Sequence, residues 1–200
     1  MSETEQKMSR KEQILQALVH MLETNPGARI TTANLAKEVG VSEAALYRHY
    51  PSKAKMFEGL ISFIEDTIFS RINRISQDFD SATERSERVI SLVLTFAEKN
   101  PGMCRLLSGD ALSGETERLR QRIQQFFERL EVEFKQILRE AEIRENKVPI
   151  QSVQATANFC TSFVEGRIRQ YVRSEFANSP TDYLSEQLEI VLPNLLIDKA

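Results

Sequence analysis

The side chains best suited to molecular recognition lie close together, between residues 42 and 53. Tyr47, Arg48 and His49 can all donate hydrogen bonds, and Lys53 adds a positive charge nearby. No Asp or Glu occurs from residue 44 to residue 57, so this stretch of the chain carries only basic charge. Such side chains bind phosphate groups and the edges of nucleic-acid bases. The stretch therefore predicts a contact with a nucleic-acid duplex.

The side chains that usually carry catalysis or metal binding are scarce. His20 and His49 are the only histidines, and neither has a cysteine or carboxylate at a spacing typical of a nucleophile or a metal ligand. Cys104 and Cys160 are isolated, which favours two buried thiols over a disulfide or a metal site. The seven glycines are scattered and form no phosphate-binding loop. We expect no enzymatic activity, no cofactor and no metal.

The charge of the chain is unevenly distributed. The net charge is −3 over 200 residues, yet residues 1–60 hold eight Lys or Arg against seven Asp or Glu. A positive field this local gives only modest non-specific attraction to DNA. Binding should therefore depend on specific contacts or on the avidity of a dimer. The 41% hydrophobic content is enough to bury a substantial core.

Capping signals around this stretch predict two short helices joined by a tight turn. Thr31 or Thr32 can cap a first helix, Gly40 can end it in the left-handed conformation, and Ser42 can cap a second helix over residues 43–49. Pro51 stops that helix and Ser52 caps the next. The pattern is typical of a helix-turn-helix. The candidate DNA-binding residues are Thr31, Thr32, Ser42, Glu43, Ala44, Ala45, Tyr47, Arg48, His49 and Lys53.

A supporting helix is expected before the helix-turn-helix. Ser9 and Glu12 form a capping box, and an apolar stripe then runs to the turn sequence at residues 25–27. We expect a disordered tail at residues 1–8, a DNA-binding domain at 9–51 and a helical body at 52–200. Lys7, Arg10 and Lys11 could touch phosphate from the side or could belong to a solvated surface.

The body is predicted to be entirely helical, which makes the fold class all-α. A fourth helix begins at Ser52 and reaches about residue 77, and Phe63 lies off its apolar stripe, where it could pack under a neighbour or meet a partner. Ser81 and Glu84 predict another capping box. The further predictions are helices at 82–99, 103–107, 115–144 and 150–178, a loop at 145–149, and a last helix that opens at Ser179-Pro180 and bends or ends at Pro193.

Particular residues in the turn and second helix resemble the DNA-binding signature of TetR-type repressors. Tyr50 stands where those proteins usually have Phe, a change that keeps the aromatic ring and adds a hydroxyl. The matching residues are Val41, Ser42, Leu46, Tyr47, His49, Tyr50 and Lys53.

The resemblance extends over most of the chain to nucleoid occlusion factors of the SlmA type. It is carried by VSEAALYRHYPSK and then, in order, by FIED at 63–66, RIN at 71–73, NPG at 100–102 and VRSEF at 172–176. The resemblance implies a TetR-fold homodimer that binds specific sites on double-stranded DNA, with two dimers on one site as a further option. It also implies that the DNA-bound dimer antagonises polymers of the division protein FtsZ.

The same resemblance implies where FtsZ would bind. The C-terminal tail of FtsZ would dock between the fourth helix and the helix at 82–99, and basic side chains there would suit an acidic, partly apolar peptide. The matching positions are Phe63, Arg71, Leu92, Thr95, Lys99 and Asn100.

Two alternatives stay open at this stage. The body could hold a small-molecule cavity, as in a ligand-responsive repressor, instead of a protein-docking surface. The last two helices could close a monomer core or pair across a two-fold axis. Residues 1–13 are almost wholly polar, and the apolar stretch at 89–97 is far shorter than a membrane span. We therefore expect a cytoplasmic, nucleoid-associated protein that does not contact a membrane.

Overall fold

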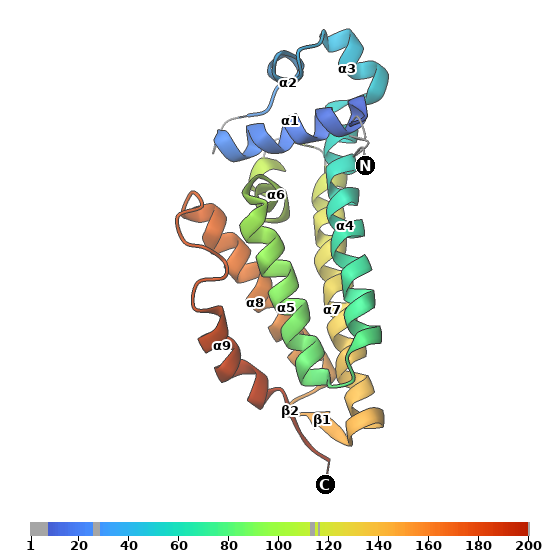
Figure 1. The fold of residues 1–200 in the computed structure, drawn as a ribbon, viewed down its shortest axis with the longest axis vertical. Helices are drawn as coiled ribbons and strands as arrows, with labels where there is room; N and C mark the ends of the chain where they lie inside the picture. The colour runs from blue at the N-terminus through green and yellow to red at the C-terminus, as the bar shows by residue number, and fades with distance from the viewer. Residues whose placement is uncertain (1–7, 26–28, 113–114, 116, 200) are drawn as a thin grey trace, which may run out of the picture.

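The computed structural model describes residues 8–25, 29–112, 115 and 117–199 (Figure 1). Within these residues the chain is dominated by helices, with one short antiparallel ribbon. The elements in order are α1 (Arg10–Thr24), α2 (Thr32–Val39), α3 (Glu43–His49), α4 (Lys53–Asp78), α5 (Ala82–Lys99), α6 (Pro101–Leu107), η1 (Asp110–Leu112), α7 (Glu117–Glu145), β1 (Lys147–Pro149), α8 (Val153–Arg173), α9 (Leu184–Val191), η2 (Leu192–Asn194) and β2 (Leu196–Asp198).

The first three helices form a small unit at one end of the molecule (Figure 1). The predicted capping box is present, since Ser9 Oγ accepts from the amide of Glu12 and the Glu12 carboxylate accepts from the amide of Ser9. Gly40 ends α2 at φ 73°, a conformation that favours glycine. Leu35 and Leu46 are fully buried and join α2 and α3 to the core of this unit. The helix-turn-helix predicted from the caps is confirmed.

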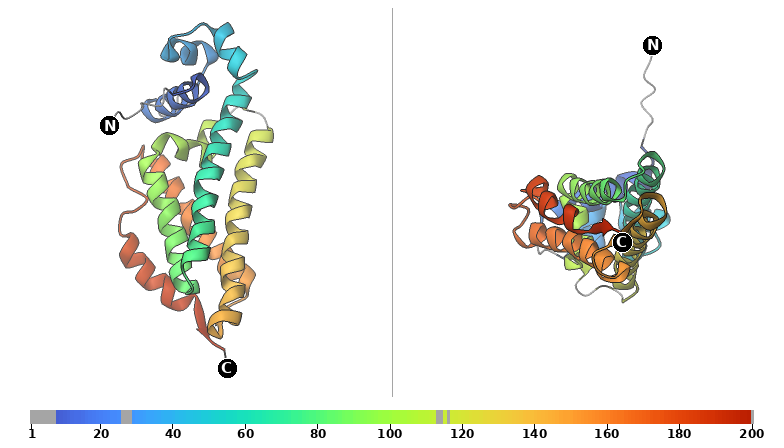
Figure 2. Two further views of the ribbon diagram at one scale, coloured as in Figure 1. Left: turned by 45° about the vertical axis from the view of Figure 1, so that its right-hand side comes forward. Right: turned by 90° about the horizontal axis from the view of Figure 1, so that it is seen from below.

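α4, α5 and α7 run alongside one another over the length of the body (Figure 2). The apolar stripe predicted for α4 is buried from Phe57 to Ile72, and Ile75 is half-buried. Met56 and Phe69, which lie away from the centre of that stripe, are also buried, because α1, α5 and α7 cover more than one face of α4. Phe63 is different, since its side chain is 49% exposed.

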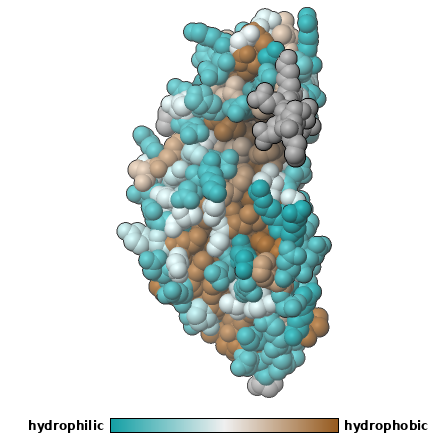
Figure 3. Space-filling view, viewed as in Figure 1, coloured by the Kyte–Doolittle hydropathy of each residue, from teal (hydrophilic) through white to brown (hydrophobic). Residues whose placement is uncertain are grey.

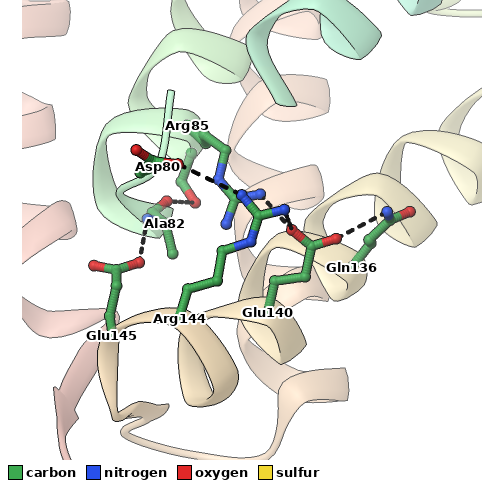
Figure 4. A network of polar contacts seen from close by, with 8 residues as sticks. Asp80, Ala82, Arg85, Gln136, Glu140, Arg144 and Glu145 are labelled. Atoms are coloured by element: carbon green, nitrogen blue, oxygen red, sulfur yellow. Dashed lines mark hydrogen bonds and ion pairs between the residues drawn. The ribbon is translucent and has the colours of Figure 1, made fainter. Parts of the chain in front are cut away.

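A buried ion pair joins the start of α5 to the end of α7 (Figure 4). Arg85 is fully buried and its Nη1 donates to Glu140 Oε2 at 2.7 Å, while Arg144 approaches the same oxygen at 3.2 Å. Among the described residues, Nε and Nη2 of Arg85 have no hydrogen-bond partner. Glu140 is thus the carboxylate that the two neighbouring guanidinium groups share, while Arg144 also pairs with Asp80 at 3.8 Å.

The structure corrects one capping interaction and one helix boundary near α5. Ser81 caps α5 as predicted, but the Glu84 carboxylate binds Arg88 at 2.8 Å, and the amide of Ala82 donates to Glu145 at 2.6 Å. The capping box is therefore only half formed. α6 begins at Pro101, two residues before the predicted start, because proline is well suited to the first turn of a helix.

The loop predicted at residues 145–149 is wrong. Lys147–Pro149 pair antiparallel with Leu196–Asp198, with Val148 opposite Ile197. The partner strand lies almost fifty residues further along the chain, so local patterns give no sign of it. The ribbon is the one sheet among the described residues and leaves the all-α class unchanged.

The boundaries predicted for the last two helices are also wrong. α8 ends at Arg173, and Glu175 and Phe176 follow with positive φ values of 51° and 69°. Arg167 then donates to the carbonyl oxygens of Ser179, Pro180 and Asp182, at 3.0, 3.1 and 2.6 Å respectively. These bonds keep residues 179–182 out of a helix, so that α9 begins only at Leu184.

Candidate nucleic-acid interface and docking groove

The outer edge of the helix-turn-helix joins residues from α2 and α3. Thr32 Oγ1 donates to the Glu43 carboxylate at 2.8 Å, and the Tyr47 hydroxyl donates to Thr32 Oγ1 at 3.3 Å. Glu43 and Tyr47 are exposed and Thr32 is half-buried. This chain of hydrogen bonds fixes the position of the Tyr47 ring before any duplex binds.

Two of the candidate residues act as caps. Thr31 Oγ1 accepts from the amide of Asn34, and Ser42 Oγ accepts from the amide of Ala45, each at 3.2 Å. Both residues are exposed, and a hydroxyl that accepts one hydrogen bond can still donate another. Ala44, in the first turn of α3, is exposed and has a small side chain. A duplex could therefore approach the start of α3 closely.

The basic residues near α3 lie in different surroundings. Arg48 is exposed and His49 is half-buried. Lys55 forms an ion pair with Glu58 at 2.6 Å, and that hydrogen bond lowers the pKa of the Glu58 carboxyl. Arg48 is thus the cation of this edge that is best placed to reach a phosphate.

Lys53 lies differently from what the sequence led us to expect. Its side chain is 18% exposed, its Nζ donates to the carbonyl oxygen of Ile30 at 2.9 Å, and it forms an ion pair with Glu115. The ammonium group therefore connects three parts of the chain instead of facing outward. Its partners are distant in sequence, so no spacing pattern could have placed them. Lys7, which was considered for a lateral phosphate contact, lies outside the described residues.

A groove of about 530 Å³ runs between α4 and α5. All six positions that the resemblance implied for FtsZ line it, and they do so together with three residues that sequence reasoning missed. Thr67 could have been found, since it lies midway between Phe63 and Arg71 at four-residue helical spacing. The lining residues are Phe63, Thr67, Arg71, Ser91, Leu92, Thr95, Phe96, Lys99 and Asn100.

The groove combines apolar surface with positive charge. Phe63, Leu92 and Phe96 supply the apolar part, and Arg71 and Lys99 supply the charge. No carboxylate is among the lining residues, and within the described part of the chain neither Arg71 nor Lys99 forms an ion pair. Apolar surface lies among polar side chains over the middle of the body (Figure 3). The groove can accept an acidic peptide that also carries apolar side chains.

Metal ligands, thiols and long apolar helices are the remaining features of the described residues. They contain no cluster of His, Cys, Asp and Glu that could hold a metal ion. Cys104 and Cys160 are both buried, and burial raises the pKa of each thiol to about 12. Neither thiol is an effective nucleophile at neutral pH. No helix in the described part of the chain is both long and apolar enough to cross a membrane.

Comparison with known proteins identifies the family. Residues 14–60 match the family of bacterial regulatory proteins called tetR, and residues 78–196 match the SlmA-like group of tetracyclin repressor-like C-terminal domains. The nucleoid occlusion factor SlmA of Marinomonas sp. (strain MWYL1) is 58% identical over 193 residues, which cover 96% of this chain and 98% of that protein. The chain belongs to the SlmA family. SlmA of Colwellia psychrerythraea is 55% identical over 94% of this chain and 95% of that protein.

Solved structures support the fold of this SlmA family member. A TetR transcription regulator from Haloarcula marismortui has a TM-score of 0.78 at 16% identity, and the match covers 94% of this chain and 98% of that one. The regulator FadR from Bacillus subtilis, solved with stearoyl-CoA, has a TM-score of 0.72 at 18% identity and covers 92% and 98% of the two chains. The identity is low, so these structures bear on the fold alone. As a SlmA-family protein with a tetR N-terminal domain, the chain is a DNA-binding protein.

Proposed function

We propose that this protein is a nucleoid occlusion factor that, as a DNA-bound homodimer, antagonises the assembly of FtsZ polymers over the chromosome. The observation that carries the proposal is the groove between α4 and α5, where basic and apolar side chains meet without a carboxylate. The relatives that share more than half of its residues are named as nucleoid occlusion factors. In this proposal the protein works in the cytoplasm at the nucleoid.

DNA recognition would begin with α3 entering a major groove. Tyr47 and Arg48 are exposed on that helix, and Glu43, Ala44 and Ala45 line its first turn. Arg48 can donate to a phosphate or to guanine, and the Tyr47 hydroxyl can meet a base edge or a phosphate. Thr31, Thr32, Ser42 and His49 complete the proposed contact surface, and Lys53 would support it from beneath.

Dimerisation would use the outer face of α8. Ala155, Phe159, Ser162 and Gly166 recur at intervals of three or four residues and are all exposed. A methyl group placed on Gly166 would meet no atom within 4 Å, so this face is open in a single subunit. Tyr183 and Ile190, before and on α9, are exposed apolar side chains as well. A two-fold pairing of these helices would place two α3 helices about 34 Å apart, one turn of duplex.

α4 connects the two proposed sites. It begins at Lys53 under the DNA-binding unit and extends without a break through Phe63 and Arg71, which line the groove. DNA that fixes the N-terminal end of α4 would therefore restrict the position of that groove wall. This gives a physical route by which DNA promotes docking of the FtsZ tail.

The proposal is tested by a filament assay with three components. The dimer, a duplex that it selects from random-sequence DNA and FtsZ with GTP are mixed, and filament mass is followed by sedimentation. We expect filament mass to fall when protein and duplex are both present. A ligand-responsive repressor that lacks this activity would leave the filaments unchanged, which would overturn the proposal.

Charge reversal in the groove should separate filament antagonism from duplex binding. Arg71→Glu should abolish filament antagonism and leave duplex binding unchanged, because Arg71 lies on the body, away from α3. Arg74→Glu is the matched control, since Arg74 is exposed on the same helix but does not line the groove. If Arg71→Glu antagonises filaments as well as the Arg74→Glu variant does, the groove is not the docking site.

A further inference from the structure

α6 binds the C-terminal end of α1 through one buried side chain. Arg105 is only 3% exposed, and its Nη1 donates to the carbonyl oxygens of Leu22 and Asn25 at 3.0 and 2.9 Å. Its Nε donates to Asp110 Oδ2 at 2.6 Å. The last carbonyl groups of a helix carry partial negative charge, so a guanidinium group suits this position. Arg105 thus ties the body directly to the DNA-binding unit.

The backbones of α1 and α6 also touch. A methyl group on Gly102 would collide with the carbonyl oxygen of Val19 and would lie 3.2 Å from the amide nitrogen of Glu23. Glycine is therefore needed where the two helices meet. A contact between backbones has no side chain that can change rotamer, so it holds the helices at a fixed separation.

α6 begins where the docking groove ends. Asn100 ends α5, lines the groove, and accepts hydrogen bonds from the amides of Met103 and Cys104 in the first turn of α6. Arg105 follows five residues later. One short helix therefore connects the groove to the end of α1, separately from the route along α4.

We propose that Arg105 is a positioning residue that sets the angle of the DNA-binding unit against the body and couples the groove to DNA. Without it the DNA-binding unit would still be held by the Gly102 contact, by the Lys53–Ile30 hydrogen bond and by its covalent link to α4 through residues 50–52, but the end of α1 could rock against α6. A dimer must present two α3 helices at one spacing, so rocking weakens duplex binding without removing any duplex contact. The inferred coupling between the groove and DNA binding rests on the proposed docking of FtsZ in that groove.

The test compares Arg105→Met with the wild-type dimer in three measurements. These are affinity for a duplex selected from random-sequence DNA, the salt dependence of that affinity, and affinity for an FtsZ C-terminal tail peptide with and without duplex. Duplex affinity should fall about tenfold through lost preorganisation. The salt slope should stay unchanged, because Arg105 touches no phosphate. Peptide affinity without duplex should also stay unchanged, whereas its increase on adding duplex should be lost.

Arg122→Met is the matched control. Arg122 pairs with Glu65 at 2.6 Å and joins α7 to α4 inside the body, so its loss should not affect duplex binding. Asp110→Ala is a milder second variant, in case circular dichroism shows that Arg105→Met does not fold. It removes only the partner of Nε, and duplex affinity should fall about threefold for the same reason.

The possible outcomes separate this inference from the proposed function. A folded Arg105→Met or Asp110→Ala protein with wild-type duplex affinity would overturn the inference, and so would a loss of peptide affinity in the absence of duplex. If the wild-type protein selects no duplex, or binds the peptide equally with and without it, the proposed function itself fails.

Discussion

Arg48 and Lys53 lie five residues apart, yet only Arg48 presents its charge to solvent. Lys53 is bound to Ile30 and Glu115, whereas Arg48 is exposed beside Tyr47. From sequence alone both residues would be assigned to phosphate. The structure distinguishes a cation that can contact DNA from one that supports the helix-turn-helix.

The salt dependence of duplex binding should separate these two roles. Arg48→Ala should lower the slope of log affinity against log salt by about 1, because one phosphate contact is lost. Lys53→Met should weaken binding and leave the slope as it is, because its effect acts through the position of α3. Fluorescence anisotropy over a series of salt concentrations measures both. A lower slope for Lys53→Met would instead show that Lys53 contacts a phosphate.

The local features of the DNA-binding unit could be predicted from sequence, and its remote contacts could not. The caps at Ser9, Thr31 and Ser42 and the turn at Gly40 depend on residues within a few positions, so their chemistry is visible in the sequence. The partners of Lys53 lie 23 and 62 positions away. Only the folded chain brings them together.

At the scale of the helices, the Glu140 carboxylate should be important for stability because its partner on α5, Arg85, is fully buried. Arg85 depends on Glu140, and Arg144 lies beside them (Figure 4). Glu140→Ala would leave two guanidinium groups close together, one of them fully buried. We expect a loss of about 3 kcal/mol in the free energy of unfolding. The double variant Glu140→Ala, Arg85→Met should recover most of the lost free energy of unfolding, as measured by urea unfolding.

The same ion pair should respond to acid. The hydrogen bond from Arg85 lowers the pKa of Glu140 below its ordinary value of 4.5. The stabilisation is therefore complete above pH 4.5 and is lost as the pH falls through the lower pKa of the folded state. The stability difference between wild type and Glu140→Gln should be constant from pH 7 to 5 and shrink below 4.5. A difference that grows on acidification would contradict this assignment.

The ends of helices were the least predictable feature at this scale. α5 was placed correctly because its apolar residues and its Ser81 cap are local. The start of α9 was not, because Arg167, Glu98 and the hydroxyls of Ser179 and Thr181 hold the preceding turn together from three segments. The groove was located by family resemblance, since no spacing rule joins Phe63 to Lys99.

At the scale of the whole molecule, the proposed function requires two subunits acting together. Phe159→Glu places a charge on the proposed α8 seam, where the side chain is half exposed, so the monomer core should stay intact. We expect analytical ultracentrifugation to show a monomer at micromolar concentration. Duplex affinity should fall by about a hundredfold or more, because the second α3 no longer contributes by avidity.

Ile143→Glu is the control for that substitution. Ile143 is an exposed apolar residue on α7, outside the proposed seam, and the variant should remain a dimer. A Phe159→Glu protein that sediments as a dimer would show that the subunits pair through another surface.

The β1–β2 ribbon has a practical consequence for imaging. β2 pairs with β1, which lies between α7 and α8, so the C-terminus lies at the opposite end of the molecule from α2 and α3 (Figure 1). α1, by contrast, starts close to α3 and α4. A fluorescent reporter fused after β2 would therefore lie far from the bound DNA. A reporter fused before α1 would lie beside the DNA-binding helices and could block the duplex sterically.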